Sequence, residues 1–358
     1  MIASRLIAWQ QVHGRHDLPW QRTRDAYRIW LSEIMLQQTR VSTVVPYFVD
    51  FVARFPDVRA LADATLDDVL AAWSGLGYYG RARNLHRCAI EVVGRFGGAF
   101  PSDPGLLESL PGIGRSTAAA IAAFACGTRA AILDANVRRV LSRHAGVLGD
   151  PSSAATTAEL WRLAERELPH DGIEPYTQGL MDLGATVCLR TRPSCASCPI
   201  AADCVALREG LVEAIPSRRS RAPVPRRACT MLVVRRADEV LLEKRATSGV
   251  WGGLWSLPEA ARGLAEPAAE IERRFALRAT PVGTLPEFDH AFTHFRLRVQ
   301  PLLLRCEGAA ALADARSHRW LPLSQASQAP LPGPVKALLL RLREPGAGEG
   351  TGGSATAA

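Results

Sequence analysis

The sequence predicts a multidomain protein in which an all-α N-terminal part precedes an α/β C-terminal part. The first observation is helical spacing of apolar residues, for example at residues 30–36 and 61–73, without long alternating runs in the first 215 residues. The second is a segment of three prolines and five arginines at residues 216–227, which cannot pack a core and is expected to be a linker. The third is the strand-like pattern that follows this segment.

These observations divide the chain into four parts. An N-terminal helical domain is expected over residues 1–215, the linker over 216–227, an α/β domain over 228–343 and a disordered Gly/Ala-rich tail over 344–358. Within the α/β domain, a helix is expected at residues 267–277 and strands at residues 229–234, 240–242 and 295–304.

Composition excludes several classes of protein. The 358 residues are 47% hydrophobic and 22% charged, which rules out a largely disordered chain. No apolar run approaches the roughly 18 residues of a transmembrane helix, and the N-terminus is too polar for a secretory signal, so a cytoplasmic protein is expected. The net charge of +8 favours a polyanionic partner, although excess arginine can also simply keep a surface soluble.

Four of the eight cysteines are gathered in one short segment. A cytosolic chain that clusters its cysteines in this way is expected to bind a metal ion or cluster rather than to form disulfides. Four thiolates hold either zinc or an iron–sulfur cluster, and the spacing alone leaves both open. The pattern is Cys188-x6-Cys195-x2-Cys198-x5-Cys204.

The segment Leu110–Thr117 (LPGIGRST) precedes a helix expected at residues 118–125. Gly112 and Gly114 allow a tight turn that leaves several backbone N–H groups at a helix start, which suits a phosphate oxygen. The alternative is an ordinary helix–helix turn.

Asp134 comes next, in the segment LDANVRRV. It is suited to cap the helix that Val137 and Val140 continue, and this structural role is one reading of the residue. In the other reading, the helix dipole and backbone N–H groups keep the Asp134 carboxylate ionised, so that it can stabilise a cationic sugar.

Glu33 is four residues before Gln37, which places the two on one face of a helix. A carboxyl group lodged among Ile29, Trp30 and Ile34 loses hydration, which raises its pKa toward the range of a general acid. The alternative is a solvated glutamate on an amphipathic helix. The turn Trp73–Tyr79 (WSGLGYY) likewise suits either a core corner or a DNA contact.

The chain resembles the adenine DNA glycosylase (MutY) family of the helix-hairpin-helix superfamily. Residues 18–205 match its order and spacing strongly, and the match continues more weakly to about residue 340. The stretches that carry the resemblance are LSEIMLQQTRVSTVVPYF, WSGLGYYGRARNLHRCA, LPGIGRSTAAAI, LDANVRRVLSR and TQGLMDLGATVC. The resemblance implies an all-α helix-hairpin-helix glycosylase core with a [4Fe–4S] loop at residues 188–204, followed by an α/β Nudix-like lesion-recognition domain.

The resemblance also implies a set of site residues. Glu33 would protonate the base, Asp134 would stabilise the sugar cation and Asn136 would orient Asp134 or water. Tyr78 would wedge beside the opposite base and Gln37 would fill the vacated stack. Cys188, Cys195, Cys198 and Cys204 would hold the cluster. DNA contacts would come from Gln37, Tyr78, Arg81, Arg83, Gly112, Gly114, Ser116, Gln178, Arg190 and Arg192.

In the C-terminal domain, Phe292, Thr293 and His294 stand where the family recognises 8-oxoguanine, and the alternative for His294 is an exposed strand end. Magnesium-dependent Nudix hydrolysis needs several carboxylates on one helix, and residues 267–277 offer only Glu270 and Glu272. The domain is therefore expected to read a lesion without hydrolysing nucleotides.

The implied activity is removal of adenine mispaired with 8-oxoguanine or guanine in double-stranded DNA, by a nucleoid-associated protein that is expected to be a monomer without membrane contact. Ser116 stands where bifunctional relatives carry a lysine, and serine has no amine for a Schiff base, so a monofunctional enzyme is expected. The alternatives are a bifunctional glycosylase/lyase for oxidised pyrimidines and a DNA-binding protein without catalysis.

Overall fold

The computed structural model describes residues 2–217, 223–307 and 317–343. The chain forms two compact units, one made of Met1–Ala64 with Arg83–Arg221 and the other of Thr65–Ala82 with Ala222–Ala358. The second unit therefore draws eighteen residues from the N-terminal half of the sequence. The expected tail and the middle of the expected linker lie outside the described residues, and the proposed domain boundaries at residues 215 and 228 remain a prediction.

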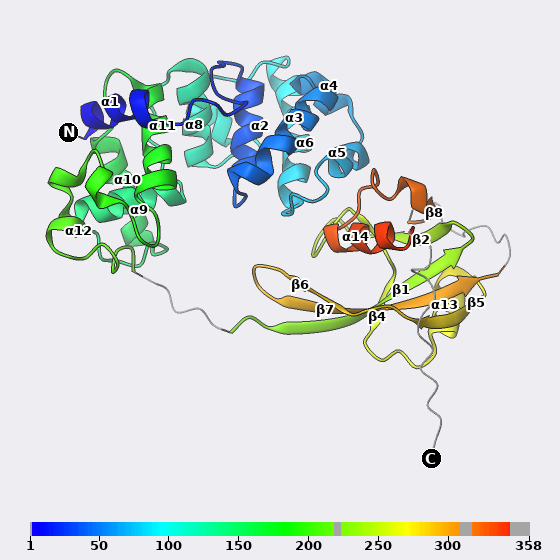
Figure 1. The fold of residues 1–358 in the computed structure, drawn as a ribbon. Coiled ribbons are helices and arrows are strands. Elements are labelled where there is room, and N and C mark those ends of the chain that lie inside the picture. Colours follow the sequence, from blue (N-terminus) through cyan, green and yellow to red (C-terminus); the bar gives the residue numbers. More distant parts are fainter. Residues whose placement is uncertain (1, 218–222, 308–316, 344–358) are drawn as a thin grey trace. The chain divides into compact units, whose positions relative to one another are not determined.

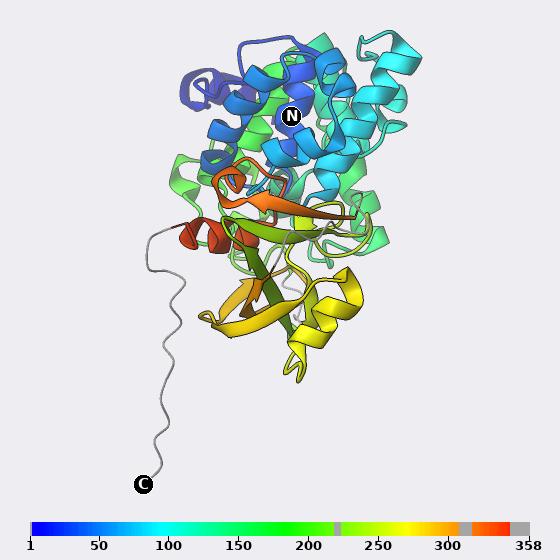
Figure 2. The same cartoon turned by 90° about the vertical axis from the view of Figure 1, so that its right-hand side faces the viewer.

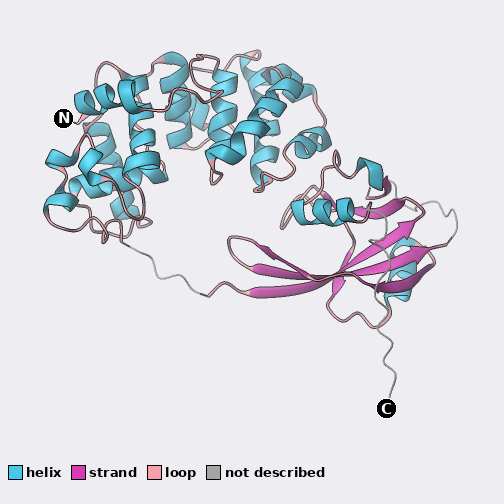
Figure 3. Ribbon diagram, in the orientation of Figure 1, coloured by secondary structure: helices cyan, strands magenta, loops and turns pink. Residues whose placement is uncertain are grey.

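The described part of the first unit is helical, as expected (Figures 1 and 3). None of the helices formed by the described residues is long and apolar enough to cross a membrane. A π-helical turn, η1 (Leu183–Val187), extends α11, and two 3₁₀ turns, η2 (Cys195–Ser197) and η3 (Ala201–Asp203), follow it. The α-helices are α1 (Ala3–His13), α2 (Ala26–Leu36), α3 (Val41–Arg54), α4 (Val58–Asp63), α6 (Gly80–Phe96), α7 (Pro104–Glu108), α8 (Arg115–Cys126), α9 (Ala135–Ala145), α10 (Ala154–Arg166), α11 (Ile173–Asp182) and α12 (Val205–Arg208).

Side-chain caps decide where several of these helices begin. Asp25 accepts a hydrogen bond from the Tyr27 amide and starts α2. The single helix expected over residues 61–73 is wrong, because the Thr65 hydroxyl accepts from the Asp68 amide and starts a separate helix, α5 (Leu66–Ala72). Similarly, α2 ends at Leu36, so Gln37 lies beyond the helix and does not share its face with Glu33.

The core of the first unit joins α1 to α8, α9, α10 and α11. Leu6, Ala120, Val137, Leu160 and Tyr176 represent these helices in it, and each is almost fully buried. The alanine-rich α8 offers little side-chain volume, so its neighbours can approach closely. This packing fixes the starts of α9 and α11, where the candidate site lies.

The second unit is a mixed sheet with helices, which confirms the expected α/β class (Figure 3). Its strand order is β3-β2-β1-β7-β5, with β4 on β1, β6 on β7 and β8 on β2. The helices α13 (Pro267–Phe275) and α14 (Gly333–Arg341) lie on opposite sides of the sheet (Figures 1 and 2), and η4 (Leu323–Gln325) precedes α14. The strands are β1 (Arg226–Arg236), β2 (Glu239–Lys244), β3 (Trp255–Ser256), β4 (Glu259–Ala261), β5 (Ala279–Thr284), β6 (Phe288–Ala291), β7 (Arg296–Cys306) and β8 (His318–Pro322).

Strands β1 and β7 run parallel and in register from the Arg226–Arg296 pair to the Arg235–Arg305 pair. Ile271 and Phe275 of α13 pack on this part of the sheet, where Leu232 and Leu304 are fully buried. Strand β1 begins at Arg226, so backbone pairing with β7 includes the last two residues of the segment expected to be a linker.

Candidate active site

One cavity of about 350 Å³ lies in the first unit and is large enough for a small ligand. Its wall brings together Glu33 from α2, Asp134 and Asn136 from the start of α9, and Gln178 from α11. The first three were predicted as catalytic from segments that are far apart in the sequence. Ile29 and Leu36 contribute apolar lining from α2.

The Glu33 carboxyl group is partly buried beside apolar neighbours on α2. Loss of hydration raises its pKa to about 8, and the negative charge of Asp134 contributes to the same increase. Glu33 is therefore protonated at neutral pH and able to donate a proton, which is the property that the sequence predicted.

Asp134 caps α9, as expected, and its carboxylate accepts a hydrogen bond of 2.7 Å from the Val137 amide. Burial nevertheless raises the pKa of Asp134 above its ordinary value, which differs from the expectation that the cap alone keeps it ionised. Hydrogen bonds from the Val137 and Asn136 amides and the charges of Arg139 and Arg138 act in the opposite direction, toward ionisation. Asp134 has these stabilising partners and Glu33 does not, so the two carboxyls differ in their tendency to ionise.

The backbone around Asp134 is held by its neighbours. The Ser116 hydroxyl on α8 accepts a hydrogen bond of 2.9 Å from the Leu133 amide, one residue before Asp134. Asn136 accepts a bond of 2.9 Å from the Arg139 guanidinium. A side chain at Gly184 would lie 2.6 Å from the Asn136 Cβ, so only glycine lets η1 approach α9 this closely. Ser116, expected as a DNA contact, thus positions the catalytic segment.

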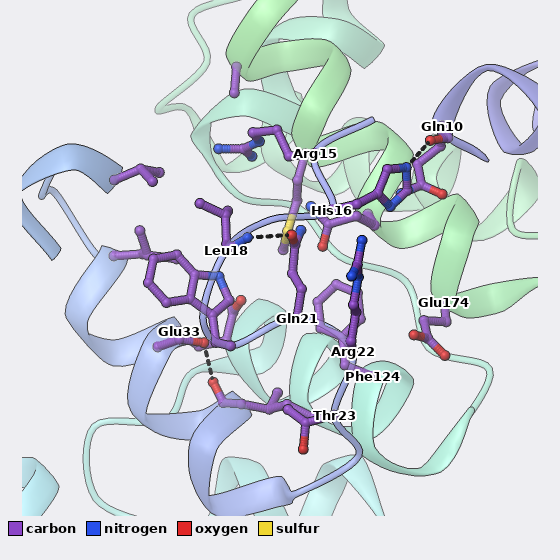
Figure 4. A pocket seen from close by; sticks show the side chains of 18 of the residues that line it. Gln10, Arg15, His16, Leu18, Gln21, Arg22, Thr23, Glu33, Phe124 and Glu174 are labelled. Carbon is purple, nitrogen blue, oxygen red and sulfur yellow. Dashed lines mark hydrogen bonds between the residues drawn. The ribbon is translucent and has the colours of Figure 1, made fainter. Parts of the chain in front are cut away.

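Several lining residues were not predicted. The segment between α1 and α2 contributes Gln21, Arg22 and Thr23, and α11 contributes Glu174, so the labelled side chains surround the cavity from different elements (Figure 4). This segment has no motif of its own, and its role follows only from the way it crosses the cavity. Arg22 has a φ of 59°, a conformation that is uncommon outside glycine.

A buried polar network supports the α11 side of the cavity. Asp182 is fully buried and pairs with the Arg15 guanidinium at 2.7 Å. The Gln178 amide donates to the same carboxylate at 2.9 Å. Gln178, expected as a DNA contact, therefore lies in the cavity wall with its amide engaged by Asp182.

The turn between α7 and α8 carries the two glycines that were predicted to contact DNA. Gly112 and Gly114 are exposed, while Ile113 between them is buried. Gly112 has a φ of 80°, and a Cβ there would lie 2.8 Å from the Asn84 Cβ. Gln37 reaches toward α8, with its amide nitrogen 3.5 Å from the Thr117 hydroxyl.

The four cysteines of residues 188–204 are free thiols and line one small cavity together with apolar side chains. Arg143 is almost fully buried beside them and donates to the carbonyl oxygens of Ile215, Leu189 and Arg190 and, at 3.4 Å, to the Cys188 sulfur. Within the described ranges, no group of three or more His, Cys, Asp or Glu side chains is close enough to hold a metal ion. Arg190 and Arg192 are exposed on the same loop.

In the second unit, the turn after β6 carries the residues expected to read a lesion. Thr293 and His294 are exposed, and the Phe292 ring stacks on Phe295 at 4.5 Å between centroids. Trp251 packs on Phe292 at 5.3 Å. His290 belongs to β6, its ring lies 4.6 Å from the Phe292 ring, and burial lowers its pKa.

Carboxylates near α13 are neutralised by arginines. Glu243 pairs with Arg274 at 2.6 Å, and Glu259 pairs with Arg245 at 2.6 Å. Glu270 pairs with Arg273 at 2.7 Å on the same helix. Each of these three acids therefore has an arginine as its partner, and the expectation that the domain reads a lesion without hydrolysing nucleotides remains a prediction.

The turn Trp73–Tyr79 belongs to the second unit. Tyr78 is 45% exposed with a φ of 49°. The Arg81 guanidinium stacks on the Trp73 and Tyr78 rings and donates to the Gly77 carbonyl at 3.3 Å, and burial lowers its pKa to about 10. Arg83, the next predicted phosphate contact, is partly buried in the first unit.

Known proteins resemble both units. The matching family models describe HhH-GPD superfamily base excision DNA repair proteins, over residues 31–166, and the NUDIX domain, over residues 229–341. An adenine DNA glycosylase of Buchnera aphidicola subsp. Acyrthosiphon pisum is 34% identical, with 94% of this chain and 97% of that protein covered. An adenine DNA glycosylase of Homo sapiens is 32% identical, covering 88% and 69%. The solved structure of a thermostable thymine-DNA glycosylase aligns with 58% of this chain and 95% of its own, at 29% identity and a TM-score of 0.53.

Proposed function

Because this chain belongs to the adenine DNA glycosylase family, we propose that it removes adenine mispaired with 8-oxoguanine or guanine from double-stranded DNA, in base excision repair. The main support for this proposal is that Glu33 and Asp134 line the same cavity. The two carboxyl groups have different partners there and differ in their tendency to ionise. Pairs of carboxyl groups in unlike environments are typical of glycosidic bond hydrolysis.

The reaction begins when the adenine is flipped out of the duplex into the cavity, because its target bond cannot be reached inside the stack. Protonated Glu33 donates its proton to a purine ring nitrogen, which turns adenine into a neutral leaving group. The C1′–N9 bond then breaks, its electron pair leaves with the base, and the sugar becomes an oxocarbenium ion. The Asp134 carboxylate stabilises that cation, and Asn136 orients the carboxylate or the water that adds to C1′.

Ser116 supports a monofunctional enzyme over a bifunctional glycosylase/lyase. Its hydroxyl is engaged by the Leu133 amide and it has no amine to form a Schiff base with the sugar. Reduction with borohydride should therefore trap no covalent complex with DNA, and a trapped complex would favour the bifunctional alternative.

DNA contacts are proposed for residues of both units. Gly112 and Gly114 would offer amides to a phosphate, while Arg83, Arg190 and Arg192 would supply positive charge. Gln37 would fill the space left by the flipped base, and Tyr78 would enter the stack beside the opposite base. In the second unit, Phe292, Thr293 and His294 would recognise 8-oxoguanine.

The activity itself is tested by single-turnover excision on duplexes that differ in one pair. Adenine should be released opposite 8-oxoguanine and guanine but not opposite thymine, and the product should be an intact strand with an abasic site. Release of oxidised pyrimidines instead would support the alternative glycosylase, and binding without any release would support a protein that only docks on DNA.

We also propose a [4Fe–4S] cluster held by Cys188, Cys195, Cys198 and Cys204. The four thiols lie around one apolar cavity, and burial together with the nearby cysteines raises the pKa of Cys198 to about 11, a cost that a bound cation would offset. A cluster would brace the loop that carries Arg190 and Arg192. Purified protein is expected to contain about four iron and four sulfide ions per chain. Cys198→Ser should lower the iron content, whereas Cys126→Ser, at an exposed cysteine outside the loop, should not. Stoichiometric zinc without sulfide would contradict the cluster.

Arginines at the starts of β1 and β7 provide a further test of DNA binding. Arg226 and Arg296 are exposed register partners on neighbouring parallel strands, and neither forms an ion pair with a described acidic residue. Two positive charges side by side on a sheet repel each other, and a bound polyanion would relieve this repulsion. The double variant Arg226→Gln/Arg296→Gln is expected to reduce the slope of log binding constant against log salt concentration by about two.

The matched control for this experiment is Arg273→Gln/Arg305→Gln, which removes two exposed charges from the same unit, one of them at the far end of β7. Its salt slope should equal that of the unaltered protein. Equal slopes for all three proteins would show that the starts of β1 and β7 do not contact phosphates.

A further inference from the structure

The segment of residues 65–82, which carries the candidate wedge Tyr78, is held by side chains of the second unit at two places. The first is Asp67 at the start of α5. Its carboxylate forms an ion pair with Lys244 of β2 and accepts a hydrogen bond of 2.9 Å from the Trp255 indole of β3. The Lys244 ammonium lies 4.9 Å and the Arg319 guanidinium 4.3 Å from the centre of the Trp255 ring. Two cations and an aromatic ring therefore surround the Asp67 carboxylate.

The second place is the carbonyl oxygen of Leu331, just before α14. The Ser74 hydroxyl donates a hydrogen bond of 2.8 Å to it, and the Tyr79 hydroxyl lies 3.4 Å from the same oxygen. Ser74 and Tyr79 are 6% and 7% exposed, so these bonds are shielded from water and their loss would leave buried polar groups without partners. The Trp255 amide donates to the carbonyl of Pro330 at 3.0 Å, which joins the two places.

The turn between these two places contains a residue in an unfavourable backbone conformation. Gly75 and Gly77 have φ values of 114° and 74°, which suit glycine, but Tyr78 has a φ of 49°, which a tyrosine rarely adopts. Such a conformation persists only where the surroundings determine it. Ser74 and Tyr79 flank the turn, so their contacts with Leu331 are placed to hold Tyr78 in this conformation, together with the Arg81 guanidinium that stacks on its ring.

We propose that Asp67, Ser74 and Tyr79 are positioning residues through which the lesion-reading unit sets the conformation of Tyr78 and thereby part of the discrimination between 8-oxoguanine and guanine. This inference rests on the proposed function. The same compact unit carries the exposed turn of Phe292, Thr293 and His294, so the residues that would read the base and the side chain that would be inserted beside it belong to one unit. Helix α6 begins at Gly80, directly after the turn, and continues into the first unit.

The test measures how strongly each variant prefers 8-oxoguanine. Single-turnover rates of adenine release are compared opposite 8-oxoguanine and opposite guanine, and affinities are compared for the corresponding duplexes that contain an abasic site instead of adenine. Asp67→Ala and the double variant Ser74→Ala/Tyr79→Phe should each lower the ratio of rates about tenfold, a size typical of coupling between two sites. Asp67→Asn, which keeps an acceptor for the Trp255 indole, should restore part of the ratio.

The matched control is Asp68→Asn, which alters the neighbouring acid of the same helix, whose carboxylate accepts a hydrogen bond of 2.5 Å from the Thr65 hydroxyl. It should leave the ratio unchanged. Trp255→Phe removes the indole donor and keeps an aromatic ring, so combining it with Asp67→Ala should lower the ratio no further than Asp67→Ala does alone.

Two results would overturn the inference. In the first, both rates fall by the same factor, which is the behaviour of a residue that only stabilises the fold. In the second, Asp67→Ala and Asp68→Asn have equal effects. The affinity ratio needs no catalysis, so failure of the unaltered protein to release adenine would refute the proposed function and still leave the coupling measurable on the abasic duplexes.

Discussion

Replacing Glu33 by glutamine is expected to lower the single-turnover rate of adenine release by about 10²- to 10⁴-fold, the range that general acids contribute. Glutamine keeps the size of the side chain and its hydrogen-bonding capacity but has no proton of suitable acidity to give. Binding of the mismatched duplex, measured by fluorescence anisotropy, should remain close to that of the unaltered protein. If binding and release were lost together, Glu33 would have a structural role.

The raised pKa of Glu33 adds two pH-dependent expectations. The rate should fall as pH rises past about 8, where Glu33 loses its proton, and it should also fall at low pH, where the Asp134 carboxylate takes up a proton. The folded state also binds the proton more tightly than the unfolded chain, so stability should fall as pH rises from about 4.5 to 8. Glu33→Gln lacks this dependence and should be more stable at pH 7 by up to about 3 kcal/mol, at about 1.4 kcal/mol per pH unit. Unfolding of the two proteins in urea at pH 5 and pH 7 measures the difference.

Asp134→Asn is expected to lower the rate by about 10²- to 10³-fold, as for the removal of a charge that stabilises a transition state. Asparagine is an effective N-cap, so α9 should keep its start and the melting temperature should change little. Because the Asp134 charge contributes to the raised pKa of Glu33, the fall in rate at high pH should also move to lower pH.

The control for Asp134→Asn is Asp103→Asn. Asp103 caps α7 by accepting from the Leu106 amide, in the way that Asp134 caps α9, but it does not line the cavity. Its rate and its pH profile should match those of the unaltered protein. A comparable loss of rate in both variants would mean that helix capping, rather than charge in the cavity, explains the effect of Asp134.

Local signals in the sequence predict much of this fold. Apolar spacing and capping residues locate α2, α8 and α9, two strand-like runs joined by a short turn locate β1 and β2, and alternation locates β7. The break between α4 and α5 was missed because apolar periodicity continues across Thr65, whose capping hydroxyl separates the two helices. The short strands β3, β4 and β6 were also missed, since two to four residues carry too little periodicity and their pairing with distant strands decides them.

The meeting of Glu33, Asp134 and Asn136 at one cavity could be predicted because each stands in a segment with its own pattern, and the resemblance connects these segments. The other residues that line the cavity could not be predicted. Arg22 and Glu174 lie in segments without a motif, and tertiary packing alone brings them to Glu33. Ser116 and Gln178 were expected to contact DNA, whereas their partners here are the Leu133 amide and Asp182, contacts that join positions with no shared local signal.

The assignment of residues 65–82 to the second unit bears on how such proteins can be recombined. A chimaera joined only within the linker would pair the sheet of one parent with the α5 segment of the other, and Lys244 and Trp255 would face a foreign residue in place of Asp67. A graft that keeps native partners together needs three crossover points, near residues 64, 82 and 221. In evolution, the same arrangement would make a substitution at Asp67 depend on compensating changes nearly two hundred positions away in the gene product.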